Sequence, residues 1–296
     1  MEENNNESSA PYSSEELSEI TGGTINDMEI QPVEIEGEET ESEESSTTEE
    51  IPEHVVPVIN VNPMKYREST ARFSSASWFE EASNNVIILA GLGGIGSWTA
   101  LLLSRLRPQN ITLYDGDVVE EVNMAGQLFK ETDIGETKVS AVANTLRNYS
   151  GYWANTTRWY TESSLTSNIM ICGFDNMSAR KLFYKNWKRR VEYAHDAGAL
   201  LYIDGRMAAE EFQVYCLVGN DSRAMENYEK TLFSDDEAEE TICSYKQTTY
   251  MAAMIGAVIS NLYVNFCANR SNLPYPRDLP YLTEYDGRMM YFKTTA

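Results

Sequence analysis

One short stretch constrains the fold of this chain more than any other. Val86–Ala90 is an apolar run rich in β-branched residues, the glycine-rich segment Gly91–Gly96 follows it directly, and Ser97–Leu106 has the apolar pattern of a helix. A strand, a glycine turn and a helix in this order are typical of nucleotide binding. The missing side chains let the backbone approach phosphate oxygens, and the helix start offers free N–H groups. The candidate phosphate-side residues are Gly91, Gly93, Gly94 and Gly96; the alternative is a purely structural turn.

Polar side chains follow the next predicted strand. Asn110–Tyr114 ends at Asp115, which is where an acid reaches a ribose hydroxyl in dinucleotide-binding folds. Asp117 and Gln127 lie in the acid-rich loop that comes next. We expect this loop to make polar contacts to a nucleotide, and its acids to help hold a cation.

A lysine opens the following helix, which is predicted from about Asp133 to Tyr149. Lys138 lies in its first turn, where a cation is unfavourable against the helix dipole. The position therefore favours an anionic partner for Lys138. The alternative is an exposed surface lysine.

A second acid follows the apolar run Asn168–Phe174. Carboxyl ends of parallel strands form the ligand-binding edge of doubly wound sheets, so Asp175 is placed to coordinate Mg²⁺ beside phosphates. Asp175 also suits the N-cap of the helix predicted over Ala179–Tyr193. Both roles remain open at this point.

Strands and helices alternate through most of the chain, which predicts an α/β fold: a Rossmann-like, doubly wound, mostly parallel sheet with antiparallel strands at the C-terminal end. The Asp-Gly pair at 286–287, between two apolar runs, predicts the closing hairpin. The remaining expected strands are Trp153–Thr161, Ala199–Ile203 (ending at Asp204-Gly205-Arg206), Phe212–Val218, Leu279–Tyr285 and Arg288–Thr294.

Two long segments are harder to assign. Gly219–Thr241 has no periodicity and is predicted as a long functional loop that leads to Cys243. Gln247–Asn269 has no charged residue and is long enough to span a membrane, but its many amide and hydroxyl side chains favour a helix in the core or at a subunit contact.

The charge of the chain is concentrated at its start. Seventeen of its 46 acidic residues, and none of its 23 basic ones, lie in residues 1–50. Residues 1–55 are predicted to be a disordered acidic tail and linker, either solvating or docking, and residues 56–296 to be one domain. Met64–Glu81 is predicted to be an amphipathic helix against that domain. The body has no basic face for nucleic acid.

Cysteine usage and the start of the chain indicate a cytoplasmic setting. The four cysteines form no C-x-x-C pair, and MEENNNESS has neither the basic nor the apolar region of a secretory signal. We expect no membrane partner and no structural zinc.

Four motifs in order make residues 86–266 resemble the ThiF/MoeB/ubiquitin-activating enzyme superfamily. They are the glycine turn Gly91–Ser97, the acidic loop from Asp115 through Asn123 to Gln127, the segment Asp133–Lys138, and Cys172–Asn176. The signature Asn-x-Ala-Gly-Gln at 123–127 also looks like ThiF-type proteins of bacterial viruses.

The resemblance implies ATP-dependent adenylation with Mg²⁺. In such enzymes a carboxylate attacks the α-phosphate of ATP and releases pyrophosphate. In the better-known members this carboxylate is the C-terminal glycine of a small ubiquitin-like or sulfur-carrier protein. Carried over, Asp115 binds the ribose, the glycines line the phosphates, Asn123 and Lys138 steady the phosphate charge, and Asp175 holds Mg²⁺. A homodimer is implied, with Arg67 or Arg72 reaching the partner's site.

One departure from the family pattern and one match to some of its members bear on activity. Gly126 stands where the family commonly has an arginine, so one phosphate-binding cation is missing. Cys243 stands where some members carry a thiol that forms a thioester or sulfur linkage, although a free cysteine is also often a small buried hydrophobe.

Two other functions share some of these residues. An NAD-dependent oxidoreductase would use the glycine turn and Asp115, but it leaves Lys138 and Asp175 unexplained. A non-catalytic nucleotide-binding regulator or scaffold is favoured by Gly126.

Overall fold

A computed structural model describes residues 66–233, 247–271 and 274–296. The chain divides into two compact units, Met1–His54 and Val55–Ala296. The predicted acidic tail and Cys243 lie outside the described residues. Everything below concerns the second unit.

The described residues form one eight-stranded sheet in the order β3-β2-β1-β4-β5-β6-β7-β8. The first five strands in that order run parallel, and β6, β7 and β8 are antiparallel to their neighbours. This confirms the predicted fold class. The strands are β1 (Val86–Ala90), β2 (Asn110–Tyr114), β3 (Asn155–Thr157), β4 (Ile169–Cys172), β5 (Leu201–Ala208), β6 (Glu211–Val218), β7 (Leu282–Asp286) and β8 (Tyr291–Thr295).

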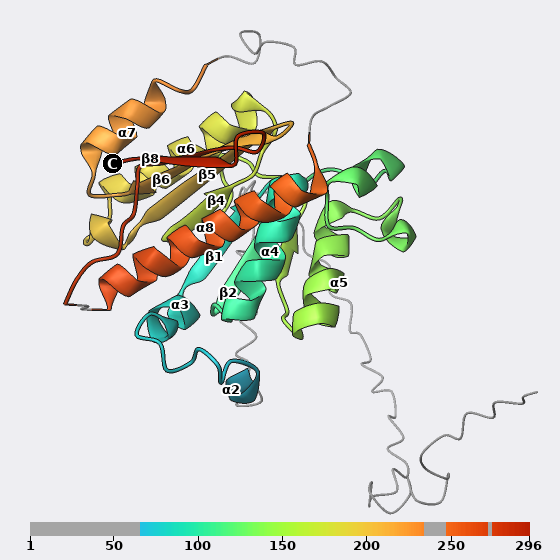
Figure 1. The fold of residues 1–296 in the computed structure, drawn as a ribbon, viewed down its shortest axis with the longest axis horizontal. Helices are drawn as coiled ribbons and strands as arrows, with labels where there is room; N and C mark the ends of the chain where they lie inside the picture. The colour runs from blue at the N-terminus through green and yellow to red at the C-terminus, as the bar shows by residue number, and fades with distance from the viewer. Residues whose placement is uncertain (1–65, 234–246, 272–273) are drawn as a thin grey trace, which may run out of the picture. The chain divides into compact units, whose positions relative to one another are not determined.

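Helices cover both faces of the sheet, and Figure 1 shows α8 and α4 crossing one face with α6 behind the strands. The helices are α2 (Tyr66–Ser69), α3 (Phe79–Asn84), α4 (Gly94–Leu106), α5 (Lys138–Ser150), α6 (Met177–Glu192), α7 (Ser222–Glu229) and α8 (Thr249–Arg270), with short 3₁₀ turns η1 (Glu121–Ala125), η2 (Glu131–Asp133) and η3 (Ala197–Ala199).

The central strands β1, β2 and β4 are buried on both faces because successive side chains alternate between two cores. On β1, Ile87 and Leu89 pack with α4, α5 and α8, whereas Ile88 and Ala90 pack with α6 and α7. This explains why these strands are continuously apolar in sequence rather than alternating. The second core is largely aromatic and includes Trp187.

Two predicted boundaries on the C-terminal side of the sheet were wrong. β5 does not end before Asp204; it runs to Ala208, because antiparallel β6 continues to pair with it beyond the parallel strands. The predicted loop Gly219–Thr241 begins with helix α7, whose N-cap Asp221 accepts a hydrogen bond from the Ala224 N–H. The sequence signal for this helix was Asp221, a residue type that commonly serves as a helix N-cap.

Other local predictions need smaller corrections. The described part of Met64–Glu81 is not one helix but two short ones joined by turns. The third strand is only three residues long. The closing hairpin is present, with a four-residue connection at 287–290 rather than a tight Asp-Gly turn.

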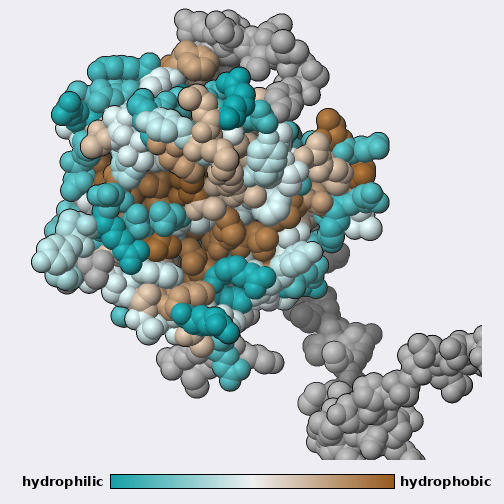
Figure 2. Space-filling view, in the orientation of Figure 1, coloured by the Kyte–Doolittle hydropathy of each residue, from teal (hydrophilic) through white to brown (hydrophobic). Residues whose placement is uncertain are grey.

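α8 is the long uncharged helix of the sequence. By length and composition alone it is apolar enough to cross a membrane, but 56% of its most apolar stretch is buried inside the protein. Ile255, Ile259 and Phe266 belong to the core against the sheet, as expected of a core helix. Figure 2 shows that apolar residues also emerge on the outer face of this layer, between polar ones.

Candidate functional site

A cleft of about 910 Å³ lies at the carboxyl ends of the parallel strands. Its walls come from the turns after β1, β2 and β4 and from the second half of β5. Of the predicted site residues, the structure brings these into the lining: Gly91, Gly93, Gly94, Asp115, Asp117, Gln127, Lys138 and Asp175. This is the edge at which doubly wound sheets bind ligands.

The glycines of the first turn have different roles. Gly91 has φ +84°, and a Cβ there would lie 2.4 Å from the carbonyl carbon of Gly173. A Cβ on Gly96 would lie 1.9 Å from the Gly91 oxygen. These two glycines let α4 pack directly onto the ends of β1 and β4. Gly93 is different, because a Cβ there would meet only Gln127, at 3.9 Å. Gly93 therefore leaves open the space that a phosphate group would need.

Alanine at these positions separates packing from binding. Gly96→Ala is expected to lower the free energy of unfolding by about 1–3 kcal/mol or more, since the methyl group overlaps backbone. Gly93→Ala is expected to fold normally but to bind ATP roughly 10- to 100-fold more weakly, because the methyl group enters the phosphate space and displaces the phosphate from about one charged hydrogen bond. Urea denaturation and calorimetric titration measure the two effects. Unchanged ATP affinity in Gly93→Ala would contradict a phosphate role for the turn.

Asp115 is built into the turn as well as into the cleft. Its Oδ2 accepts a hydrogen bond from the Leu92 N–H at 2.7 Å, and its Oδ1 accepts one from the Asp117 N–H at 2.9 Å. Burial raises the pKa of the Asp115 carboxyl, while these N–H donors and Lys138 oppose the rise. The carboxylate has lone pairs left for a ribose hydroxyl.

Lys138 has the anionic partner that its position predicted. Its Nζ lies 2.9 Å from Oδ2 of Asp117, and the lysine side chain is 10% exposed while the aspartate side chain is 64% exposed. Thr137 is the N-cap of α5, the helix that begins at Lys138. Lys138 thus holds a positive charge at the cleft wall, paired with an acid that solvent keeps hydrated.

Asp175 is, like Asp117, an exposed acid of the cleft, but it has no cationic partner among the ion pairs of the described residues. Its Oδ1 accepts a hydrogen bond from Asn176 at 3.3 Å. The N-cap of α6 is Asn176 rather than Asp175, because Asn176 Oδ1 accepts from the Ala179 N–H. Asp175 is therefore not held in the cap. Among the described residues no three acidic, histidine or cysteine side chains gather to hold a metal. One carboxylate with phosphate oxygens fits the way in which Mg²⁺ binds beside nucleotides.

Gln127 and Asn123, both predicted to touch the nucleotide, are placed differently. Gln127 is 8% exposed, lines the cleft, and its Oε1 is buried without a hydrogen-bond partner. A buried unpaired carbonyl is costly, so a bound ligand or water would stabilise it. Asn123 is not in the lining; its Oδ1 accepts from the Glu120 N–H and fixes the loop. A phosphate role for Asn123 stays a prediction.

Two further predicted positions, Arg72 and Gly126, do not line the cleft. Arg72 is exposed in the turns between α2 and α3, and it does not line the cleft of its own chain. Cys243 falls outside the described residues. Gly126 is buried, and a Cβ there would lie 2.9 Å from Cγ of Gln247.

A buried ionic network behind the cleft was missed from the sequence. Arg180 donates from Nη1 to Oδ1 of Asp204, and Asp204 is fully buried. Arg206 donates to Oδ2 of Asp204 at 2.9 Å. Arg180 and Arg206 both line the cleft. Burial lowers the pKa of Arg180, but the Asp204 charge outweighs this and raises it overall, so the Arg180 guanidinium remains charged.

An exposed tryptophan was also missed. Trp159 is 63% exposed and lines the cleft, and its indole lies across Gly116, where a Cβ would be 2.0 Å from the ring. Arg158 donates to the Gly116 oxygen at 2.8 Å. These residues follow the edge strand β3, which the sequence placed only loosely.

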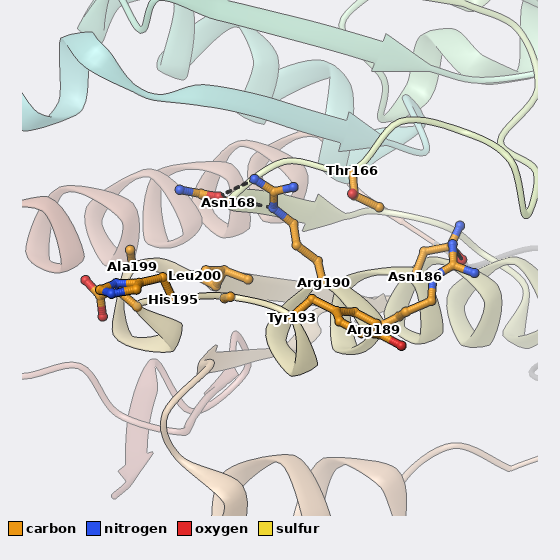
Figure 3. A pocket seen from close by; sticks show the side chains of 11 residues that line it. Thr166, Asn168, Asn186, Arg189, Arg190, Tyr193, His195, Ala199 and Leu200 are labelled. Carbon is orange, nitrogen blue, oxygen red and sulfur yellow. Dashed lines mark hydrogen bonds between the residues drawn. The ribbon is translucent and has the colours of Figure 1, made fainter.

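A second pocket, of about 450 Å³, lies at the opposite ends of β4 and β5 (Figure 3). Both Nε and Nη2 of Arg190 donate to Oδ1 of Asn168 there. None of the predicted site residues lines it. The chemistry indicated by the sequence belongs to the larger cleft.

The sheet order defines a Rossmann-like α/β fold with antiparallel C-terminal strands, and its cleft lies at the edge where such folds bind ligands. Residues 66–295 match the ThiF family, and the chain belongs to that family. The resemblance seen in the four motifs is thereby confirmed.

Relatives and solved structures agree with this assignment. Ubiquitin-like modifier-activating enzyme 5 of Drosophila erecta is 29% identical over 136 residues, covering 46% of this chain and 33% of that protein. The enzyme of the same name from Rattus norvegicus is 33% identical over 91 residues, covering 31% and 23%. The chain thus spans a third or less of the length of these relatives.

Two solved structures share the fold. E. coli MccB with ATP aligns at a TM-score of 0.58 and 14% identity, covering 79% of this chain and 72% of that chain. PaaA aligns at 0.58 and 16% identity, covering 79% and 74%.

Proposed function

We propose that this protein is an ATP-dependent adenylyltransferase that activates a carboxylate. The observation that carries the proposal is the joint placement of Gly93, Asp115, Lys138 and Asp175 around one cleft. A glycine turn at a helix start, a ribose acid, a cation and an exposed carboxylate are the groups that positioning a nucleoside triphosphate requires. An oxidoreductase would have no use for the last two.

In the proposed reaction an oxygen of the substrate carboxylate forms a bond to the α-phosphorus. The bond from that phosphorus to the bridging oxygen breaks, and pyrophosphate leaves with the electron pair. Asp115 orients the ribose, and the open face of Gly93 admits the phosphates. Lys138 stabilises charge as it moves toward the leaving pyrophosphate.

A magnesium ion, held by Asp175 and phosphate oxygens, would neutralise part of the triphosphate charge. The carboxylate of Asp175 suits this role because it is exposed and does not serve as the N-cap of α6. The other residues of the cleft are held in place by contacts within the protein and not by the magnesium ion.

We propose that the carboxylate is the C-terminus of a small ubiquitin-like or sulfur-carrier protein, or of a peptide. The names of the relatives support a ubiquitin-like substrate. The structure of MccB with an ATP analogue and MccA, at a TM-score of 0.55 and 14% identity, supports a peptide in this fold.

We also propose that the protein forms a homodimer. The outer side of α8 carries several apolar residues, with Met254 and Val258 half-buried and Ala257 exposed, next to the exposed amide of Asn261. Figure 2 shows this apolar band in the middle of the face. Arg72 would then lie in a segment able to reach a partner's cleft. Sedimentation velocity of the full chain gives the mass that tests this.

ATP–pyrophosphate exchange tests the proposed reaction. With ATP, Mg²⁺ and candidate carrier proteins ending in glycine, we expect exchange that depends on the carrier's free carboxyl terminus. Carriers amidated at the C-terminus are the control. If the protein binds both ATP and a carrier but shows no pyrophosphate exchange, the result would instead support a non-catalytic nucleotide-binding regulator.

Cys243 is proposed as the thiol that receives the activated carboxylate. Burial raises the pKa of the Cys172, Cys216 and Cys267 thiols to about 12 each, so these thiols are protonated and slow to react at pH 8. We expect one fast-reacting thiol in the native protein and none in Cys243→Ser, and a disulfide-exchange reagent counts the fast-reacting thiols. We also propose a cytoplasmic setting, which keeps all four cysteines reduced. A fast thiol that persists in Cys243→Ser would contradict the assignment.

A further inference from the structure

Gln247 occupies a position that the sequence did not single out. It lies where the chain enters α8, and its backbone forms a parallel bridge with Ala209, just after β5. The adjoining helix start is tied to the loop after β2, since Thr249 Oγ1 donates to the Ala125 oxygen at 2.6 Å. Figure 1 shows the start of α8 near the start of α4 and that loop. The backbone around Gln247 is therefore fixed on two sides.

The Gln247 side chain covers two glycines of the site. A Cβ on Gly94 would lie 2.1 Å from Oε1 of Gln247, and a Cβ on Gly126 would lie 2.9 Å from its Cγ. Gly94 is the first residue of α4, where backbone N–H groups lack helical acceptors. The amide of Gln247 thus lies against the start of the helix that is expected to receive phosphate.

The Gln247 amide has hydrogen-bonding capacity to spare. It lines the cleft, is half-buried, and makes no side-chain hydrogen bond with a described residue. Rotation about its last torsion exchanges the oxygen for the NH₂ group with little change in shape. Gln127, with its own unpaired buried oxygen, is the side chain that a Cβ on Gly93 would meet, at 3.9 Å. Each of the two consecutive glycines therefore has a glutamine side chain beside it.

We propose that Gln247 is a phosphate-positioning residue whose NH₂ group donates a hydrogen bond to the phosphate oxygens of the bound nucleotide. The inference rests on the proposed function only in requiring that a nucleoside triphosphate occupies the cleft. An uncharged amide orients the phosphates through a directional hydrogen bond and not through charge. The Gln247 side chain also occupies the space that a side chain at position 126 would need.

Calorimetric titration of the full chain with ATP and with adenosine tests the proposal. Gln247→Met keeps the length of the side chain and removes the amide. We expect it to weaken ATP binding roughly 10- to 100-fold, the range for a hydrogen bond to a charged group, and to change adenosine binding by less than about twofold. Gln247→Glu should weaken ATP binding further by repulsion. Asn261→Leu removes an exposed amide elsewhere on α8 and should behave as wild type.

Two results would overturn the proposal. Equal losses for ATP and adenosine in Gln247→Met mean that the residue only packs the site, and wild-type ATP affinity means that it makes no phosphate contact. Absence of ATP binding by the wild type removes both this inference and the proposed function. ATP binding that depends on Gln247, without pyrophosphate exchange, leaves this inference standing and removes only adenylation.

Discussion

Replacing Lys138 by methionine is expected to slow ATP–pyrophosphate exchange by about 100- to 1,000-fold, the usual cost of deleting one group that stabilises charge in the transition state. Methionine preserves the packing of the side-chain stem, which is largely buried, and removes only the ammonium group. Asp117 loses its partner, but it is 64% exposed and stays hydrated, so stability should fall by no more than about 1 kcal/mol. The effect is therefore on the reaction and not on folding.

Lys130 provides the matched control for this variant. It also pairs with an acid, Asp133 at 3.3 Å, but it is 48% exposed and does not line the cleft. Lys130→Met should exchange pyrophosphate at the wild-type rate. A folded Lys138→Met protein that exchanges as fast as wild type would exclude Lys138 from charge stabilisation.

Replacing Arg180 by methionine is expected to lower the free energy of unfolding by about 3–5 kcal/mol, the cost of removing one partner from a buried ion pair. Asp204 is fully buried and would keep only Arg206 and the Tyr228 hydroxyl, which donate to its Oδ2 at 2.9 and 3.0 Å. Arg180 also donates to the Phe174 oxygen beside Asp175, so the cleft wall should loosen as well. Urea denaturation gives the change in free energy.

Two further variants identify the cause of that loss. Lys185 lies on the same helix as Arg180 and pairs with Glu162. Both side chains are more than two-thirds exposed, so Lys185→Met is expected to cost about 0–1 kcal/mol. Adding Asp204→Asn to Arg180→Met removes the buried carboxylate that has lost one of its two cationic partners, and should restore part of the stability. If Arg180→Met costs no more than Lys185→Met, the buried pair is not what holds this part of the cleft.

The parts of the site that sequence could predict are those set by local pattern. The β1–α4–β2 unit follows from an apolar run, a glycine turn and a second apolar run, and residues after parallel strands must meet at one edge of the sheet. Asp115 and Asp175 were found in this way. Lys138 was found because a cation at a helix start needs an acid nearby.

The missed parts depend on pairings between distant segments. Asp204 reads as an acid after a strand, yet the ladder between β5 and β6 continues past it and buries it against Arg180. Arg180 had a signal of its own, since it shares a helix face with Phe183, Tyr184 and Trp187, where a cation needs a buried acid. Gln247 had none, because only the folded chain places it over Gly94.

Asn123 illustrates competition between local and distant partners. Its carbonyl oxygen satisfies a backbone N–H three residues earlier, which is the normal preference of Asn beside a helical turn. Sequence order alone does not reveal which partner an amide side chain takes.

The most direct test of the account is a crystal structure of the protein with Mg²⁺ and α,β-methylene ATP, in which the bond to be broken is stable. We predict a triphosphate over Gly93 at the start of α4, a ribose hydroxyl hydrogen-bonded to Asp115, and a metal ion about 2.0–2.1 Å from an Asp175 oxygen. A cleft without nucleotide at saturating concentration, or nucleotide bound in the pocket near Arg190 instead, would contradict it.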